Sequence, residues 1–190
     1  MRDKTDQILQ AALHIFGEKG FNESTTMEIA KEAQVAEITI YRKFKTKQNL
    51  FVSTIQSIIM KKFDKALMEY AQQVDTEQFM YDILDDRLSM ISKNRTIIQT
   101  LLSESLMGNL EQKIDLPKIM FQTLKNAMDH HFSTKSLDVD TNQLVRIFSG
   151  LLVSYIIWAP SVPYHKLATE EKHKVSKGYI ELLSSCWNIK

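Results

Sequence analysis

The sequence predicts an all-α protein, and three observations support this fold class. Only 5 glycines and 3 prolines occur in 190 residues, so the chain has few helix breakers. Apolar residues recur at steps of three and four over most of the chain, which is the spacing of one helix face. They make up 44% of the residues, which is ordinary for a globular protein with a buried core. We therefore expect helices throughout.

The first predicted helix covers residues 3–19 and ends at a glycine. Its apolar positions lie on one face, opposite several acidic and amide side chains. These positions are Ile8, Ala11, Ala12, Ile15 and Phe16. Gly20 follows Lys19 as a left-handed C-terminal cap often does, and Phe21 can fold back onto the last turn.

The next two predicted helices are short and separated by a turn of three residues, 34–36. Thr25 is a candidate N-cap, and Glu28 three residues later completes a capping box for a helix that runs to about Ala33. The third helix starts near Ala36 or Glu37, and Thr46-Lys47 opens a fourth. Three helices with this turn are the helix-turn-helix plan, in which the later helix lies in the major groove of DNA.

Charge clustering favours the same interpretation, although the net charge of +1 is uninformative. Residues 38–62 contain six basic residues and no acidic one, whereas residues 1–37 carry four basic and seven acidic residues. Positive charge therefore gathers where phosphates would be met. The alternative is a small helical core with a solvated basic edge.

An ordered set of residues adds a family resemblance to this plan. The set is Phe16-x3-Gly20, Thr25-x3-Ile29-Ala30-x2-Ala33-x-Val35 and Thr39-Ile40-Tyr41-x2-Phe44-x2-Lys47-x2-Leu50. It resembles the N-terminal domain of the TetR family of transcriptional regulators and covers about the first quarter of the chain. The resemblance implies that Thr25, Tyr41 and Lys47 hold phosphates, and that Glu37, Ile38, Thr39 and Arg42 face the groove. Thr26 and Lys43 complete the predicted DNA-binding set.

Three residues depart from the family pattern. Gln34 occupies a turn position that is usually Gly and often needs a positive φ angle. Ala36 replaces the usual Ser, so the third helix lacks its ordinary N-cap, at a cost on the order of 1 kcal/mol. Ile38 replaces a residue that is often small, and it offers only an apolar contact, such as one to a thymine methyl group.

The rest of the chain predicts a second, larger helical domain. A helix without a breaker runs from Lys47 to about Gln72, and further periodic stretches cover residues 76–92, 95–107, 117–132, 141–159 and 169–187. We expect a helix-turn-helix DNA-binding domain at residues 1–47 and a ligand-binding and dimerisation domain at residues 48–190. The last two helices have apolar faces too broad for one helix pair, which suggests a homodimer interface on the four-helix plan. Alternatively, they cover only their own core.

The resemblance also implies a small-molecule effector bound in the second domain. Adaptable apolar side chains are the candidate lining residues. They are Met90, Met107, Phe121, Phe148, Tyr155 and Trp158. Four histidines (His130, His131, His165 and His173) lack metal-ligand spacing, so we expect no metal or cofactor. Asp85, Asp86 and Arg87 are expected to be solvated, and Cys186 to pack on an apolar face.

We expect a dimeric, cytoplasmic repressor that a ligand releases from a palindromic operator in double-stranded DNA. We identify no Ser/His/Asp or Cys/His catalytic set in the sequence, so an enzyme is not expected. The longest apolar run, residues 147–159, is too short to span a membrane. Two other hypotheses remain open. One is a helical ligand-binding or enzymatic protein with a vestigial DNA-binding motif, and the other is a regulator that binds a partner without a ligand.

Overall fold

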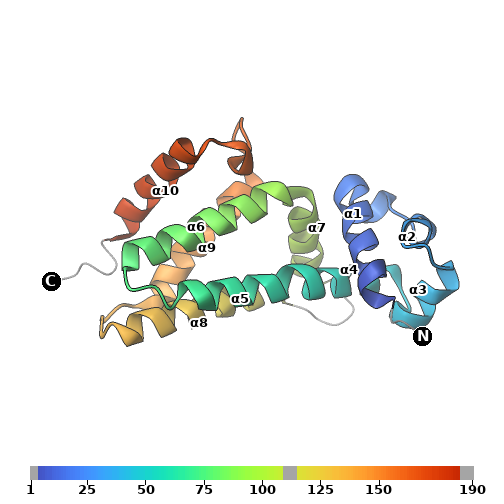
Figure 1. Ribbon diagram of the computed structural model, residues 1–190, viewed down its shortest axis with the longest axis horizontal. Coiled ribbons are helices and arrows are strands. Elements are labelled where there is room, and N and C mark those ends of the chain that lie inside the picture. Colours follow the sequence, from blue (N-terminus) through green and yellow to red (C-terminus); the bar gives the residue numbers. More distant parts are fainter. Residues whose placement is uncertain (1–3, 109–114, 185–190) are drawn as a thin grey trace. The chain divides into compact units, whose positions relative to one another are not determined.

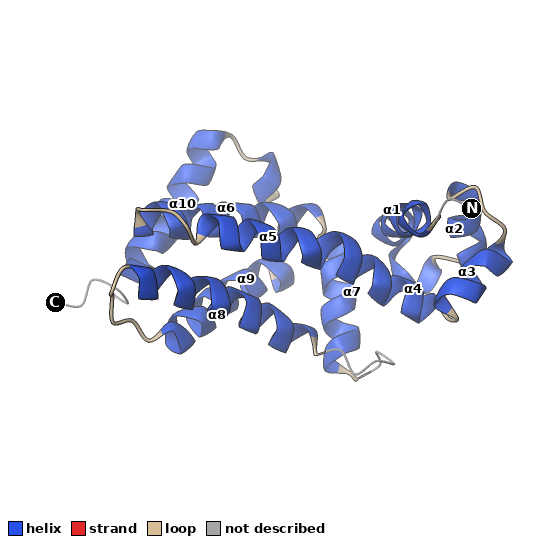
Figure 2. Cartoon of the chain, turned by 60° about the horizontal axis from the view of Figure 1, so that its bottom comes forward, coloured by secondary structure: helices blue, strands red, loops and turns tan. Residues whose placement is uncertain are grey.

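The computed structural model describes residues 4–108 and 115–184, with side chains omitted for residues 58–64 and 116. All regular elements in this part of the chain are helices (Figures 1 and 2), which confirms the all-α prediction. The chain divides into two compact units. Unit 1 consists of Met1–Asp64 and Thr96–Leu116, and unit 2 of Lys65–Arg95 and Pro117–Lys190.

Unit 1 begins with four helices. They are α1 (Thr5–Glu23), α2 (Thr26–Glu32), α3 (Glu37–Phe44) and α4 (Lys47–Thr54). Gly20 has the predicted positive φ, 75°, but its ψ of 173° is not left-handed helical, so α1 bends there before its last turn. Phe21 packs back as predicted, because its ring centroid lies 6.0 Å from that of Phe16 and 4.9 Å from that of Phe51. An aromatic cluster thus joins α1 to α4.

Helix caps explain most of these boundaries. The predicted capping box is present, since the Glu28 amide donates to Thr25 Oγ1 and the Thr25 amide donates to the Glu28 carboxylate. Thr46 caps α4 by accepting a hydrogen bond from the Asn49 amide at 3.0 Å. Ala36 stands at the N-cap of α3 without a side-chain hydrogen bond, as the sequence predicted. Helix α3 therefore depends on tertiary contacts for its position.

The predicted long helix is continuous but not uniform. After α4 the chain forms a π-helical segment, η1 (Ile55–Met60), and then α5 (Lys61–Tyr70). Helix α7 (Arg95–Leu106) follows α6 in sequence, yet its residues from Thr96 onward belong to unit 1. A methyl group added at Gly17 of α1 would lie 3.3 Å from Ile97 Cδ1, so α1 and α7 pack closely within this unit.

Unit 2 contains the remaining helices. They are α6 (Thr76–Lys93), α8 (Leu116–Thr134), α9 (Thr141–Ile157), the short 3-10 helix η2 (Tyr164–Lys166) and α10 (Thr169–Leu183). Helix α6 is central because it packs against α9, η2 and α10. Its buried Phe79 stacks on His131 of α8, with ring centroids 3.9 Å apart.

Polar side chains form part of the unit 2 core, which corrects one prediction. Arg87 is 2% exposed and pairs with Asp86, so it is not a solvated charge. Its neighbour Asp85 accepts a hydrogen bond at 2.9 Å from the hydroxyl of the fully buried Tyr164, which also bonds Ser176 at 2.8 Å. Apolar periodicity could not reveal these partners, because Asp85 and Tyr164 lie far apart in sequence.

The two units differ in extent from the two predicted domains, because unit 1 includes residues beyond Lys47. Compactness alone does not assign a function, so the predicted functional division at residue 47 stays a prediction. None of the described helices is long and apolar enough to cross a membrane. The predicted position of Cys186, on an apolar helix face, lies outside the described residues.

The turn between α2 and α3 generates a prediction about stability. Gln34 has a φ angle of 50°, in the left-handed region where a Cβ atom is unfavourable. Gln34→Gly should therefore raise the free energy of unfolding by roughly 0.5–1 kcal/mol. This gain is the backbone strain relieved in the folded state minus the extra conformational entropy that glycine gives the unfolded chain. Urea unfolding measures the change. Gln34→Ala, the control, keeps the Cβ atom and should bring no such gain; a gain as large as that of the glycine variant would contradict the interpretation.

Candidate nucleic-acid interface

Helix α3 has one buried face and one exposed face. Ile40 is 1% exposed and anchors the helix in the unit 1 core, whereas Ile38 is 73% exposed. At about 100° per residue, Ile38 and Arg42 lie about 40° apart and both about 160° from Ile40. Arg42 is also exposed. An apolar side chain and a guanidinium group are therefore presented together on the side away from the core.

A cluster of three polar groups sets the orientation of α3. The buried hydroxyl of Thr26 on α2 donates to Glu37 Oε1 at 2.6 Å and lies 3.1 Å from the Tyr41 hydroxyl. The single proton of Thr26 is committed to Glu37, so the Tyr41 hydroxyl donates to Thr26. Glu37 and Tyr41 are the first and fifth residues of α3. This cluster ties both residues of α3 to α2.

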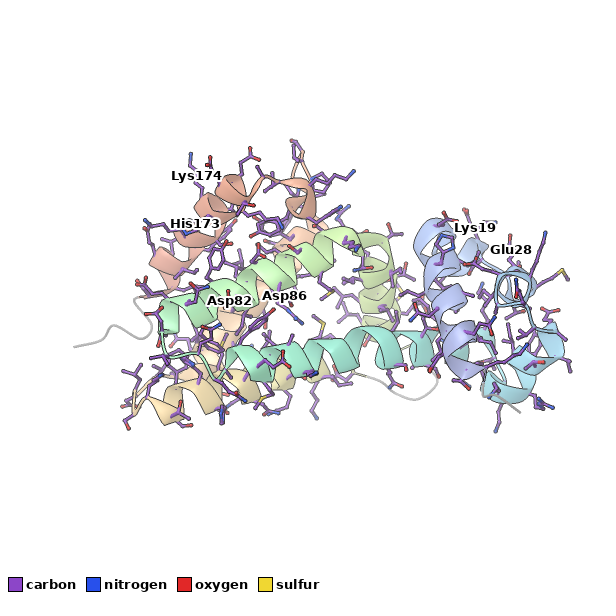
Figure 3. The ribbon with its side chains drawn as sticks, in the orientation of Figure 1. Lys19, Glu28, Asp82, Asp86, His173 and Lys174 are labelled. Atoms are coloured by element: carbon purple, nitrogen blue, oxygen red, sulfur yellow. The ribbon has the colours of Figure 1, made fainter. Side chains whose placement is uncertain are left out.

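The start of α2 is held by charge as well as by its cap. Lys19 on α1 pairs with Glu28 on α2 at 2.5 Å, and the two side chains point toward one another (Figure 3). The hydrogen bond from Lys19, followed by those from Thr25, lowers the pKa of the Glu28 carboxyl to about 2. The same pair raises the pKa of Lys19. Thr25, a predicted phosphate ligand, is thus fixed at an exposed helix N-terminus, where backbone amides favour an anion.

Lys47 has contacts inside the domain that the sequence did not predict. Its ammonium group donates to the carbonyl oxygens of Ser24 at 2.7 Å and Asn22 at 3.3 Å, and lies 4.6 Å from the centroid of the Phe21 ring. Burial lowers the pKa of this amine, against a smaller opposite effect of the Glu28 charge. An ammonium group has three donors, so these contacts leave room for a phosphate. Lys47 therefore also fastens the end of α1 to α4.

The structure brings the nine predicted DNA-binding residues together on α2, α3, one N-cap and the start of α4. Their exposure differs, which separates them into two groups. Thr25, Ile38, Tyr41, Arg42 and Lys43 are exposed, whereas Thr26, Glu37, Thr39 and Lys47 are buried or half-buried. Lys43 also donates to Thr5 Oγ1 at 2.8 Å. The nine roles stay predictions, and the buried hydroxyl of Thr26 has a demonstrable role inside the domain.

The six predicted ligand-lining residues do not share one environment. Met107 and Trp158 are 71% and 73% exposed, and Phe148 is fully buried. Met90, Phe121 and Tyr155 are half-buried in unit 2. Their lining role stays a prediction.

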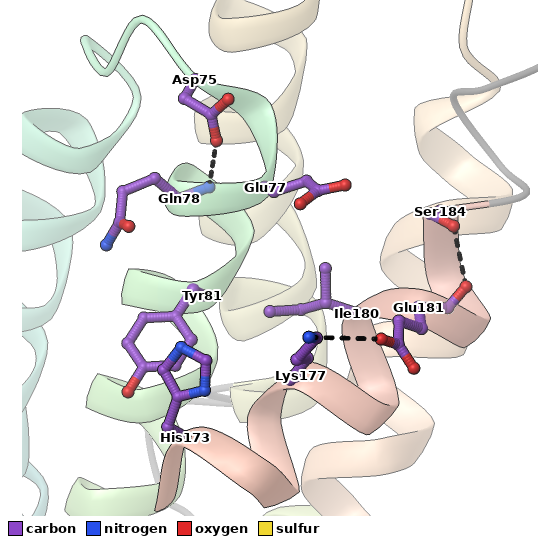
Figure 4. A pocket seen from close by; sticks show the side chains of 9 residues that line it. All are labelled: Asp75, Glu77, Gln78, Tyr81, His173, Lys177, Ile180, Glu181 and Ser184. Atoms are coloured by element: carbon purple, nitrogen blue, oxygen red, sulfur yellow. Dashed lines mark hydrogen bonds and ion pairs between the residues drawn. The ribbon is translucent and has the colours of Figure 1, made fainter. Parts of the chain in front are cut away.

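A pocket of about 440 Å³ lies between α6 and α10, and none of the six residues lines it (Figure 4). Its lining is mostly polar and includes Tyr81 and His173, whose ring centroids are 5.3 Å apart. Ile180 supplies an apolar side chain, and Lys177 pairs with Glu181 at 3.9 Å. Most of the residues that line this pocket are polar. The six residues were selected because they are Met or aromatic, so that criterion could not find this pocket.

The histidines are dispersed. His131 of α8 is buried, and burial lowers its pKa. Its ring forms hydrogen bonds with the Thr76 hydroxyl and the Ala71 carbonyl oxygen. His165 bonds Ser92, and His130 is exposed. Among the residues that the structure describes, no group of three or more His, Cys, Asp or Glu side chains could hold a metal ion.

The geometry of α1 to α3 defines a helix-turn-helix domain. Residues 8–54 match the family model described as bacterial regulatory proteins, tetR family. This match confirms the resemblance drawn from the sequence. The chain is also 28% identical over 108 residues to the nucleoid occlusion factor SlmA of Mannheimia succiniciproducens, an alignment that covers 56% of this chain. The chain spans about half the length of that relative, 50%.

Solved structures share the fold over nearly the whole chain. A TetR-family transcriptional regulator from Mesorhizobium loti aligns with a TM-score of 0.77 at 14% identity, covering 98% of this chain and 97% of its own. The regulator FadR from Bacillus subtilis, solved in complex with stearoyl-CoA, aligns with a TM-score of 0.72 at 21% identity, covering 95% and 97%. These likenesses confirm the predicted architecture of a helix-turn-helix domain followed by a helical domain.

The Lys19–Glu28 pair generates a prediction about pH. Because the folded pKa of Glu28 is about 2, below its usual 4.5, its contribution to stability is fully present above about pH 4.5. It is lost as the pH falls toward 2. Glu28→Gln should therefore flatten the decline in the free energy of unfolding between pH 5 and pH 2, measured by urea unfolding.

Two further variants sharpen the pH experiment. Lys19→Gln removes the main cause of the lowered pKa and should flatten the same decline in part, because the Thr25 hydrogen bonds remain. The double variant should resemble Glu28→Gln alone. A Glu28→Gln protein with the wild-type pH dependence would show that this carboxyl does not titrate as described.

Proposed function

We propose that this protein is a DNA-binding transcriptional repressor that acts as a homodimer and is released from a palindromic operator by a small molecule. The observation that carries the proposal is the outward face of α3. A helix anchored by Ile40 and oriented by Thr26 presents Ile38 and Arg42 away from the core. The recognition helix of a helix-turn-helix protein places such a face in the major groove.

Charge around α3 supports binding to the DNA backbone. Arg42, Lys43 and Lys45 are exposed near the end of α3. Thr25 at the N-terminus of α2 and Lys47 at the start of α4 complete a set of phosphate ligands. Tyr41 can join them if its hydroxyl donates its hydrogen bond to a phosphate oxygen instead of to Thr26. Contacts of this kind fix the register of a protein on DNA without reading its sequence.

Exposed apolar groups on α9 and α10 support dimerisation through these helices. Ile147 is 45% exposed, Ile157 52% and Leu182 75%. Gly150 and Gly178 lie mid-helix with no atom within 4 Å of an added Cβ, so each leaves room for the close approach of another helix. A homodimer supplies two helix-turn-helix domains, one for each half of an inverted repeat.

The proposed effector binds in unit 2. Support comes from the half-buried Met90, Phe121 and Tyr155, and from the likeness to FadR, whose structure contains stearoyl-CoA. Effector binding that alters the spacing of the two helix-turn-helix domains would weaken the affinity for the operator. This is allostery, because the effector site and the DNA site are distinct. We place this protein in the cytoplasm, where it would meet chromosomal DNA.

Selection from random-sequence duplexes tests the proposal as a whole. The full chain should enrich an inverted repeat, and its affinity for that duplex should fall steeply with salt as phosphate counterions are released. The absence of any enriched, salt-sensitive duplex would contradict the function.

Arg42→Ala should weaken binding to the selected duplex and reduce the slope of log K against log salt concentration by about 1, if the guanidinium neutralises a phosphate. Fluorescence anisotropy over a salt series measures the slope. Lys65→Ala, which removes another exposed cation, in unit 2, is the control and should keep the wild-type slope. Equal slopes for all three proteins would exclude Arg42 from the phosphate contacts.

Leu182→Glu should weaken the homodimer at least tenfold, because it puts a charge into the proposed interface. Sedimentation velocity over a concentration series measures the dissociation constant. The matched control is Val74→Glu, a charge at another exposed apolar position (84% exposed) in unit 2, and it should remain dimeric. A dimer that tolerates Leu182→Glu would exclude α10 from the interface.

A further inference from the structure

We propose that Ile38 reads the C5 methyl group of a thymine in the major groove, and so acts as a specificity-determining residue. The inference rests on the proposed DNA-binding function and names one base that the operator must contain. It concerns a position where this chain departs from the usual small residue.

The position of Ile38 follows from the helix geometry. It is the second residue of α3, and residues near the N-terminus of a recognition helix contact base edges. Its side chain is 73% exposed, whereas Ile40 on the opposite face is 1% exposed. DNA can approach α3 only from the side away from the core, and that is the side on which Ile38 lies.

The side chain is also held in a defined orientation. The Thr26 hydroxyl bonds Glu37 at 2.6 Å and lies 3.1 Å from the Tyr41 hydroxyl, so contacts on both sides of Ile38 in sequence fix the backbone of α3. A β-branched residue in a helix has one strongly preferred χ1 rotamer. Ile38 therefore has one preferred χ1 rotamer, which lowers the side-chain entropy that it loses on binding.

The chemistry of Ile38 restricts what it can recognise. It has no hydrogen-bonding atom, and the thymine methyl is the apolar group that a base edge presents in the major groove. Glu37, its neighbour and the acidic residue of α3, already accepts the Thr26 hydroxyl. Arg42 on the same face has only hydrogen-bond donors, so it cannot recognise a methyl group. The recognition of a thymine methyl on this face therefore falls to Ile38.

Deoxyuridine isolates this contact, because it differs from thymidine only by the missing methyl group. In the selected inverted repeat, each thymine is replaced in turn, symmetrically in both half-sites, and affinity is measured for the wild type and Ile38→Ala. At one position the wild type should lose about fourfold in affinity per half-site, the value of one buried methyl group. Ile38→Ala should show almost no loss there. The pair of changes forms a double-mutant cycle.

Two controls keep the comparison clear. Ile38 is exposed, so Ile38→Ala should unfold at the wild-type temperature, which excludes a folding defect. Arg42→Ala should bind more weakly overall and still lose about fourfold on the thymine-to-uracil change, because its own contacts do not involve the methyl group.

The outcomes separate the inference from the function on which it rests. If the protein binds a specific duplex but every thymine-to-uracil change has the same effect in wild type and Ile38→Ala, the inference is wrong and the function stands. A protein that binds no duplex contradicts both.

Discussion

The hydrogen bond from Thr26 to Glu37 is the interaction on which the position of α3 in the helix-turn-helix domain depends. Helix α3 has only eight residues, starts at Ala36 without a side-chain cap, and leaves a turn in which Gln34 adopts a φ of 50°. A helix of this length is marginal by itself. Its orientation comes from the burial of Ile40 and from the hydroxyl of the buried Thr26. This hydroxyl forms hydrogen bonds with both Glu37 and Tyr41. The proposed DNA contacts at the outer face of α3 therefore rely on polar contacts at its inner face.

A second dependence concerns the link between the units. Arg95, the first residue of α7, donates to the carbonyl oxygens of Ile156 at 3.0 Å and Ile157 at 2.9 Å, which satisfies the C-terminal end of α9. The next residue, Thr96, already belongs to unit 1, where α7 packs against α1 beside Gly17. Arg95 thus supports the end of α9 at the point where the chain passes from unit 2 to unit 1.

The helices could be predicted well from the sequence, because the side chains that cap a helix lie within a few residues of its end. The box at Thr25 and the cap at Thr46 follow from residue type and spacing, whereas the positive φ at Gln34 was implied by the family resemblance, in which this position is usually Gly. Contacts between distant residues were not predictable. The carbonyl partners of Lys47, the buried Arg87 and the pairing of Tyr164 with Asp85 all depend on how helices meet. Tyr164 follows Pro163 in a segment that reads as a loop, and only the tertiary structure buries it.

Amide hydrogen exchange of the full chain, with and without a duplex obtained by selection, tests the central claim most directly. The account holds that the segment from Thr25 to Lys47 is the DNA-reading surface, oriented by α2. It predicts that bound DNA slows exchange mainly in α3 and in the N-terminal turns of α2 and α4. Slowed exchange confined to unit 2, or none in α3 under conditions where the duplex is fully bound, would contradict it.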